Sequence, residues 1–423
     1  MPEPHPNTTT PTAADAAPRT GKATNAAAAA PSPLRMPLPR GAIDALNRQG
    51  LWLELHIISY SHYCARAKWY LASCGLKADA VRLLLPVQHV PHMISMLKEF
   101  KAARCAPTAS SKSPAATPAL AIYAAEESDG NNNNKRRRGA PLCLLQDSEL
   151  IGRWAALRAG RSVGDSGAAA RRLYGPGARL SVVEEEEGEE DGRRRAFAVL
   201  SYDDDAAASD NNDNNTTNPA LLERRLSGTL GVESRRLIYY HLLPRPDLGV
   251  RLFVRNVPPG PGLMRAWSRF VAAPLWAGAS SLLLPRLLNV NRASVVDKGL
   301  PLLEAELDAL DAMVVARGCL AGGGGGKDGE EDRVGAFLCG GGKNDGPSAA
   351  DISLAALGGI VAGDLGEGAY GAQLPALEEL PAALRELLTS RFVARPSMRF
   401  ARALWREHGA AAVAAAVAGA EVA

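Results

Sequence analysis

Tracts of low complexity interrupt the apolar pattern of this chain and limit how much of it can form a core. At about 150 residues per domain, a chain of 423 residues has room for roughly three domains. Tracts rich in Ala, Pro, Gly, Asn or charge cannot bury enough apolar surface to offset chain entropy. They cover residues 1–48, about 104–116, about 124–140, 159–220, about 321–346 and the Ala-rich end 409–423. What remains, about 250 residues, is enough for two small domains.

Runs of like charge lie within these tracts. Lys135 to Arg138 and Arg193 to Arg195 are basic, whereas Glu184 to Asp191 is acidic. Blocks of like charge repel one another and favour solvated chain, so the runs predict disordered insertions and an acidic, Asn-rich spacer at 159–220. The formal net charge of the whole chain is only +3, which gives no field that points to nucleic acid or to an anionic membrane. We therefore expect neither as a partner.

The apolar runs and the cysteines bear on the compartment. The longest uncharged run, Phe270 to Pro285, is shorter than the roughly 20 residues that span a bilayer, and Pro274 interrupts it, so no transmembrane helix is expected. The six cysteines form no close pairs and are expected as free thiols. These features predict a cytoplasmic protein. An organellar or plastid location is the alternative, because residues 1–40 are rich in Ala, Pro and Thr and poor in acid.

Two halves of different character flank the spacer. Residues 49–158 predict a strand over 51–58, a helix over 62–74, a strand over 80–85, a hairpin from 119–123 and 142–145, and a helix over 148–157. Residues 221–408 follow a helical period almost throughout. The fold class predicted is a small α/β domain followed by an all-α bundle, with long disordered insertions.

The junction after the first strand carries the most informative residues. Ser61 lies where the free N–H groups of the following helix converge and where the helix dipole favours negative charge. A thiolate placed there is stabilised. The alternative is that Ser61 only caps the helix, for which serine is a preferred residue.

The same junction resembles a known family. Ser61-His62-Tyr63-Cys64, followed by Ala65-Arg66-Ala67-Lys68-Trp69, resembles the active-site segment of the glutathione transferase superfamily, in a bacterial-type branch, and its placement is similar to the Cys-Pro-Tyr-Cys of glutaredoxins. Three later segments resemble the family in the expected order: Thr117-Pro118-Ala119-Leu120, Gln146 to Ile151, and Pro347 to Ile352. The helix pattern at 230–240 is also similar. The resemblance implies a thioredoxin-like domain at 49–158 and a helical transferase domain at 221–408.

The resemblance also implies a ligand and residue roles. Glutathione would be the co-substrate, Thr117 would meet it from a strand opened by a cis bond at Pro118, and Asp147 with Ser148 would hold its γ-glutamyl end. The first turn at Asp147 and Ser148 is otherwise an ordinary helix cap. Ser348 and Asp351 would form a capping box that starts a core helix. Relatives are commonly dimers, which makes a homodimer the expectation by analogy.

The mechanism expected from these residues is thiol activation. The Ser61 hydroxyl would donate a hydrogen bond to the glutathione sulfur and favour the thiolate, with Ser59 and Tyr60 as competing donors. Cys64 could instead form a mixed disulfide, and His62 is expected to be a surface residue. A small hydrophobic electrophile would sit against the helical domain. Its lining could include Leu263, Met264, Trp267 and Phe270, for which a core role is the alternative.

Two further function classes stay open from the sequence. One is a scaffold that keeps the fold and binds partners without chemistry, which the long insertions favour. The other is a glutaredoxin-like reductase using Cys64, although that chemistry generally needs the cysteine where Ser61 stands. The glycines before Lys327 lack the pattern of a phosphate loop, and His89 with His92 has no second ligand pair. No metal is expected.

Overall fold

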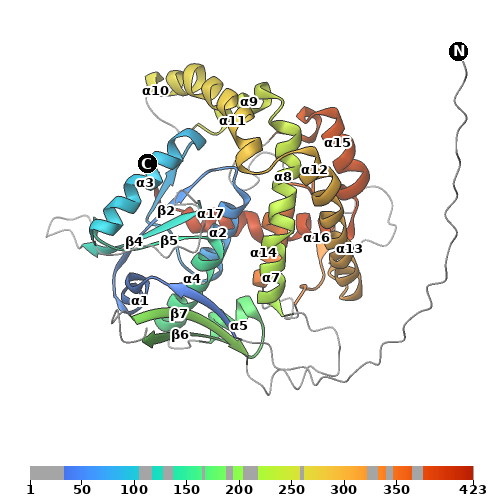
Figure 1. Ribbon diagram of the computed structural model, residues 1–423. Helices are drawn as coiled ribbons and strands as arrows, with labels where there is room; N and C mark the ends of the chain where they lie inside the picture. Colours follow the sequence, from blue (N-terminus) through green and yellow to red (C-terminus); the bar gives the residue numbers. More distant parts are fainter. Residues whose placement is uncertain are drawn as a thin grey trace, which may run out of the picture. The chain divides into compact units, whose positions relative to one another are not determined.

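The computed structural model describes most of the chain from Pro33 onward. The described residues are 33–103, 117–126, 137–163, 167–186, 194–202, 218–257, 262–321, 332–339, 346–363 and 375–422. Figure 1 shows the arrangement of the elements. The predicted glycine tract before Lys327 and the loop between the hairpin strands, residues 127–136, lie outside the described residues.

A mixed five-stranded sheet organises the first half. Its strands lie in the order β10-β3-β2-β4-β5. Strand β2 pairs in parallel with β3 and antiparallel with β4, β4 pairs antiparallel with β5, and β10 adds in parallel to β3. Their bounds are Leu51–Ile57 for β2, Ala80–Leu83 for β3, Ala119–Glu126 for β4, Arg137–Gln146 for β5 and Glu421–Val422 for β10. The strand-helix-strand unit, the hairpin and the closing helix appear as the sequence predicted.

Alternation along the strands places apolar side chains on both faces of this sheet. Leu53 and Leu55 of β2 face the main core, which also holds helix α2 (His62–Ser73) and helix α4 (Ser148–Val163). Trp52 of β2 faces the opposite way, into a smaller core with Phe100 of helix α3 (Pro86–Ala102). Alternate residues along β2 therefore point into two different cores, one on each face of the sheet, as expected for a sheet that is buried on both sides.

A second sheet lies in part of the chain that the sequence predicted to be disordered. Strands β1 (Leu34–Leu38), β7 (Arg194–Tyr202) and β6 (Ala178–Glu186) pair antiparallel in the order β1-β7-β6. Helix α1 (Arg40–Asn47) follows β1, and helix α5 (Ala168–Tyr174) precedes β6. The structure thus differs from the expected disorder at 33–48 and across much of 159–220. The reason is non-local, because β1 completes its pairing only with residues about 160 positions later in the sequence.

Opposite charges explain how the acidic run and the basic run form a hairpin, although each run by itself is self-repelling. Glu185 pairs across from Arg195, and Glu186 from Arg194, in the β6–β7 ladder. Directly opposed strand positions bring side chains within reach, and opposite charges there stabilise the pair. Arg35 of β1 adds an ion pair to Glu185. The acidic and basic runs that predicted solvated chain are, in their described parts, two arms of one sheet.

Helices form the second half of the chain, as predicted. They are α7 (Pro219–Gly228), α8 (Leu230–Leu242), α9 (Pro246–Arg255), α10 (Gly262–Trp267), α11 (Ala273–Leu287), α12 (Arg292–Ser294), α13 (Leu300–Ala316), α14 (Ala349–Gly358), α15 (Ala382–Leu388), α16 (Pro396–Leu404) and α17 (Ala410–Val417). Single turns of other helix types are η1 (Ser268–Ala272), η2 (Val295–Gly299), η4 (Leu377–Glu379), η5 (Thr389–Val393) and η6 (Trp405–Gly409). Two short strands, β8 (Leu320–Ala321) and β9 (Arg333–Val334), pair with each other.

One face of the Ala-rich end of the chain packs into the core, and the other faces solvent. Helix α17 packs against α2, and the turn before it approaches so closely that a side chain at Gly409 would lie 2.6 Å from Trp69. Val413 and Ala416 are buried, and Glu421 then extends the sheet beside Ala80. The expectation of a solvent-facing or disordered helix at 410–420 is therefore wrong for Val413 and Ala416, whereas Ala410, Ala411, Ala414 and Ala415 are exposed. Buried and exposed positions of this helix are nearly all alanine, so the sequence does not show which face is buried.

The capping box predicted for the core helix is present. Helix α14 is buried along its whole length, and the Ser348 side chain accepts from the Asp351 N–H while the Asp351 carboxylate accepts from the Ser348 N–H at 3.0 Å. The other Asp351 oxygen accepts from the Leu338 N–H at 2.9 Å. One carboxylate thus satisfies two buried backbone donors.

Replacing Asp351 by alanine should lower the free energy of unfolding by about 2 kcal/mol, because it leaves these backbone donors of Leu338 and Ser348 buried without acceptors. Chemical denaturation followed by circular dichroism measures the change. Asp351→Asn is the control, since its amide oxygen keeps one acceptor and should lose less. Equal losses in the two variants would contradict a role for the acceptor itself.

Candidate functional site

The junction between β2 and α2 holds Ser61 in the geometry of a helix cap without its usual side-chain bond. Ser61 is extended, with φ −85° and ψ 118°, and its carbonyl accepts from the N–H groups of Cys64 at 2.9 Å and Ala65 at 3.1 Å. Its hydroxyl forms no capping hydrogen bond to the helix. The side chain is partly exposed. The backbone therefore starts the helix alone, and the hydroxyl is left for another partner.

The Cys64 thiol is that partner within the chain. Cys64 is fully buried, and burial raises the pKa of its thiol, although hydrogen bonds from the Ser61 side chain, the Ile58 backbone and the Thr117 side chain act to lower it. A buried thiol with a raised pKa is a poor nucleophile, because the thiolate is the reactive form. The structure thus brings Ser61, Cys64 and Thr117 together and leaves the thiol inaccessible to a mixed disulfide.

The Thr117–Pro118 peptide bond is cis, as the sequence predicted. It precedes β4, whose first residue Ala119 pairs with His56 of β2. Thr117 is partly exposed and Pro118 is buried. Because Thr117 contacts Cys64, it lies beside the N-terminus of α2. The resemblance implied a ligand-binding residue at the start of a strand in this position.

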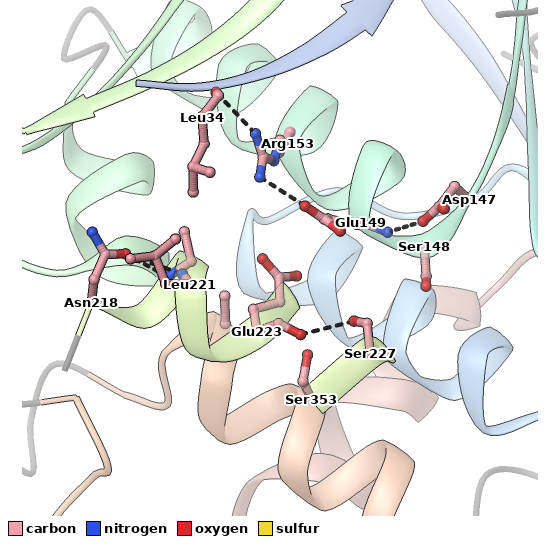
Figure 2. Close-up of polar contacts among 12 residues, drawn as sticks. Leu34, Asp147, Ser148, Glu149, Arg153, Asn218, Leu221, Glu223, Ser227 and Ser353 are labelled. Atoms are coloured by element: carbon pink, nitrogen blue, oxygen red, sulfur yellow. Dashed lines mark hydrogen bonds and ion pairs between the residues drawn. The ribbon is translucent and has the colours of Figure 1, made fainter. Parts of the chain in front are cut away.

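Asp147 and Ser148 open helix α4, also as predicted, but each has an internal partner. The Asp147 side chain accepts from the Glu149 N–H at 2.7 Å, the bond of a helix cap, and Asp147 has a φ of 151°. The Ser148 hydroxyl is buried and accepts from Arg66 Nε at 2.9 Å and Nη2 at 2.6 Å. Figure 2 shows both residues at the start of the helix. A ligand carboxylate would have to share Ser148 with this guanidinium.

Arg66 links the two halves of the chain through hydroxyl groups. Its guanidinium is buried, and besides Ser148 it donates to Ser227 of α7 and to Ser353 of α14, the latter at 3.2 Å. Tyr63 lies under the guanidinium at 5.4 Å from the ring centre. Burial acts to lower the pKa of Arg66, but Tyr70, Glu223 and other neighbours outweigh it and leave that pKa raised. The arginine therefore stays charged between the halves.

A buried carboxylate lies close to this arginine. Glu223 of α7 is fully buried and accepts a hydrogen bond from the Tyr70 hydroxyl, while its other oxygen has no hydrogen-bond partner among the described residues. Burial raises the pKa of Glu223 to about 8, an effect that Glu149 reinforces and Arg66 opposes. Figure 2 shows Glu223 between α4 and the helix that carries Ser353. Sequence analysis missed this network, because the polar residues of α2 stand among apolar ones with no motif to mark them.

Aromatic side chains and a second arginine lie on the other side of the α2 N-terminus. Tyr60 is partly exposed, and burial together with nearby Tyr239 raises the pKa of its phenol. Arg235 of α8 lies 5.8 Å from the Tyr63 ring centre and acts to lower the pKa of Tyr239. Tyr60 and Tyr239 are therefore neutral hydroxyls at ordinary pH, and Tyr60 can donate but cannot act as a base.

His62 is buried, so the expectation that it is a surface residue is wrong. Burial, together with the charges of Arg235 and Arg66, lowers the pKa of His62 to about 3. The ring stacks near Tyr63 at 4.4 Å between centres. Its place in the first turn of α2, near Gly231 and Arg235 of α8, explains the burial, which a single histidine in a polar segment does not reveal.

Residues proposed to line an electrophile pocket lie elsewhere. Trp267 and Phe270 are exposed on α10 and η1, so neither the predicted pocket nor the alternative core role describes them. The side chains of Leu263 and Met264 lie outside what the structure describes. Among the described residues no group of three His, Cys, Asp or Glu side chains could hold a metal ion, and no helix is long and apolar enough to cross a membrane. None of the five described cysteines is in a disulfide.

Comparisons with known proteins give little support beyond the geometry. No protein-family model matches the chain, and no curated protein matches it. A solved structure found by structural search is the maleylacetoacetate isomerase from Anaeromyxobacter dehalogenans 2CP-1 with bound GSH in the active site. It is 12% identical, with 86% of this chain and 96% of that chain covered, and the TM-score is 0.26. A score this low does not establish a shared fold. The mixed sheet followed by helices is consistent with a glutathione transferase-like fold.

Proposed function

We propose that this protein binds glutathione beside the N-terminus of α2 and activates its thiol for attack on a small hydrophobic electrophile. The observation that carries the proposal is the Ser61 hydroxyl, which is partly exposed at a helix N-terminus and makes no capping bond. A hydroxyl there can donate to a ligand sulfur, and the free N–H end of the helix favours its negative charge. Thr117 supports the placement, because it contacts Cys64 at the same helix N-terminus and forms the cis bond with Pro118.

In the proposed mechanism the chain's own residues position and ionise the thiol. Ser61 donates to the ligand sulfur in place of its hydrogen bond to Cys64, and Thr117 presents main-chain groups to the peptide part of the ligand. Ser148 keeps its own O–H after accepting from Arg66, so it can still donate to a ligand carboxylate, with the Arg66 charge beside it. The thiol gives its proton to water, and the thiolate sulfur then forms a bond to the electrophilic carbon, whose leaving group departs with the bonding electrons. Tyr60, with its raised pKa, stays protonated and can donate to that leaving group.

Replacing Ser61 by alanine should reduce conjugation of glutathione with an activated aryl chloride by roughly 10- to 100-fold, which is the worth of a hydrogen bond to a charged group. The pH–rate profile should shift to higher pH, because the thiol loses the donor that favours its ionised form. Initial rates across a range of pH measure both effects. Ser73→Ala, at the opposite end of the same helix, is the matched control.

Binding is measured separately, so that loss of turnover is not mistaken for loss of the ligand. Millimolar glutathione should raise the melting temperature of the wild-type chain and of Ser61→Ala, because a ligand specific for the native state stabilises it. No shift in either protein would remove glutathione from the proposal. An unchanged rate in Ser61→Ala would remove Ser61 from the mechanism.

A second candidate function is a binding protein of the same fold without chemistry. The observation that favours it is the Ser61 side chain, which already hydrogen-bonds Cys64 within the chain and so has a partner other than a ligand sulfur. This candidate predicts a thermal shift with glutathione but no turnover in any variant. The glutaredoxin-like alternative has no such support, because Cys64 is fully buried and its pKa is raised. A homodimer and a cytoplasmic location stay predictions.

A further inference from the structure

The segment formed by α10, η1 and α11 is apolar on two sides, and only one side is covered. Ala272 and Ala273 are buried in a small core with Phe253 of α9 and Leu85. In Figure 1 this segment lies beside α9 at the top of the view. A helix that is apolar all round is normally buried on every side. Here the side away from α9 meets no other part of the described chain closely enough to be buried.

Large apolar side chains follow one another along the uncovered side. Trp267 is 50% exposed, Phe270 74%, Leu275 66% and Leu282 73%, and Val271 beside them is 42% exposed. Their spacings of three, four and seven residues place them on one face of the segment. We call these five residues the apolar stripe. Exposed apolar side chains that continue along one element mark an interaction surface, whereas isolated ones do not.

Positive charge surrounds the apolar stripe in the sequence. From Leu248 to Val296 the chain carries no Asp or Glu, and it carries six arginines: Arg251, Arg255, Arg265, Arg269, Arg286 and Arg292. Arg251, Arg286 and Arg292 have exposed side chains, whereas Arg255 is paired with Glu379. Because the whole chain has a net charge of only +3, this stretch is more positive than the chain as a whole.

We propose that the apolar stripe docks this protein onto the surface of an anionic lipid bilayer. An interfacial helix buries an apolar face at the level of the lipid headgroups, and arginines beside it are attracted to anionic lipids. The arrangement needs no spanning helix, in agreement with the finding that none of the described helices could cross a membrane. It departs from the expectation, based on overall charge, that no membrane is a partner. The net charge of the whole chain does not reveal a local concentration of arginines.

A second copy of this chain fits the apolar stripe less well than a lipid surface does. A two-fold interface places the same patch of each subunit against its counterpart. Such pairing would bring the arginines of one copy close to those of the other, and among the described residues Glu379 beside Arg255 and Asp247 near Arg251 offset only part of that charge. Like charges brought together at an interface oppose association. An anionic surface gains from the same charges.

Sedimentation of the full chain with lipid vesicles tests the proposal. The vesicles are phosphatidylcholine alone, or phosphatidylcholine with about a third phosphatidylserine. We expect binding to the anionic vesicles that weakens as salt rises, since salt screens the attraction. The double variant Phe270→Ser/Leu282→Ser should bind about tenfold more weakly or worse, because it removes the two most exposed apolar side chains without changing charge.

The matched control removes two exposed apolar side chains from another helix. Leu302 and Val315 of α13 are 56% and 68% exposed, and Leu302→Ser/Val315→Ser should bind like the wild-type chain. Equal weakening in both double variants, equal binding to neutral and anionic vesicles, or no binding to either would overturn the proposal. So would a dimer that Phe270→Ser/Leu282→Ser converts to a monomer, since the apolar stripe would then bind a second copy. None of these readouts depends on glutathione.

Discussion

Replacing Arg66 by alanine is expected to lower the free energy of unfolding by about 3–5 kcal/mol, one of the largest effects of any single substitution in this chain. Arg66 is buried, and its guanidinium donates to Ser148, Ser227 and Ser353. Truncation removes these donors and leaves a cavity between the two halves of the chain. It also removes a positive charge that acts to lower the pKa of Glu223.

Two variants separate charge from packing in this prediction. Arg66→Met fills most of the volume with an apolar chain and should lose less stability than Arg66→Ala, because a buried charge is costly to keep in the first place. Arg391→Ala breaks an exposed pair with Glu304 and should cost less than about 1 kcal/mol. Urea denaturation of all three measures the differences. A loss in Arg66→Ala no larger than in Arg391→Ala would show that the buried network does not join the halves.

Replacing Glu223 by glutamine should change how stability depends on pH. Burial raises the pKa of Glu223 to about 8, whereas an unfolded glutamate titrates near pH ~4.3. Between these values the folded chain binds a proton that the unfolded chain has lost. The stability that Glu223 contributes is therefore present at low pH and falls as pH rises towards 8. The fall is about 1.4 kcal/mol per pH unit where the folded chain holds the whole proton and the unfolded chain has lost it. Glu223→Gln cannot ionise and should lack this fall.

The window from about pH 6.5 to 8 isolates the effect. His56 and His62 are buried with pKa values lowered to about 2 and about 3, so below pH ~6.5 they add stability as pH rises and oppose Glu223. Above that pH unfolded histidine is already neutral. We expect the wild-type chain to lose about 1–2 kcal/mol relative to Glu223→Gln across this window, measured by urea denaturation at each pH. The same change in Glu378→Gln, on the surface, would contradict the assignment to burial.

Local patterns in the sequence were enough to predict the first sheet and the start of the core helix. Strand β2 follows an apolar run and helix α2 begins after Ser61, whereas the cis bond at Thr117–Pro118 was expected from the family resemblance. The capping box at Ser348 and Asp351 is present where its spacing placed it. These features depend on residues within a few positions of one another, which is why a single sequence reveals them.

Partners far apart in the sequence decided the features that were missed. Strand β1 is stable only against β7, and Arg153 of α4 fixes its start by donating to the Leu34 carbonyl at 3.3 Å, as Figure 2 shows. The charged runs near Glu185 and Arg195 read as repulsive until the hairpin sets them opposite each other. Exposure of Phe270 could not be read from an apolar helix, because periodicity does not say which face has a partner.

The sequence alone determined the start of α2, the apolar runs of β2 and β3 and the hydroxyl at the α2 N-terminus, since each is a matter of neighbouring residues. Only the tertiary structure decided that Ser148 already accepts from Arg66, that Cys64 is buried beside Ser61, and that Glu223 lies in the interior. These are facts about surroundings. Burial, and the pKa shifts and pairings that follow from it, depend on which distant segments pack together, and that is set by the fold as a whole.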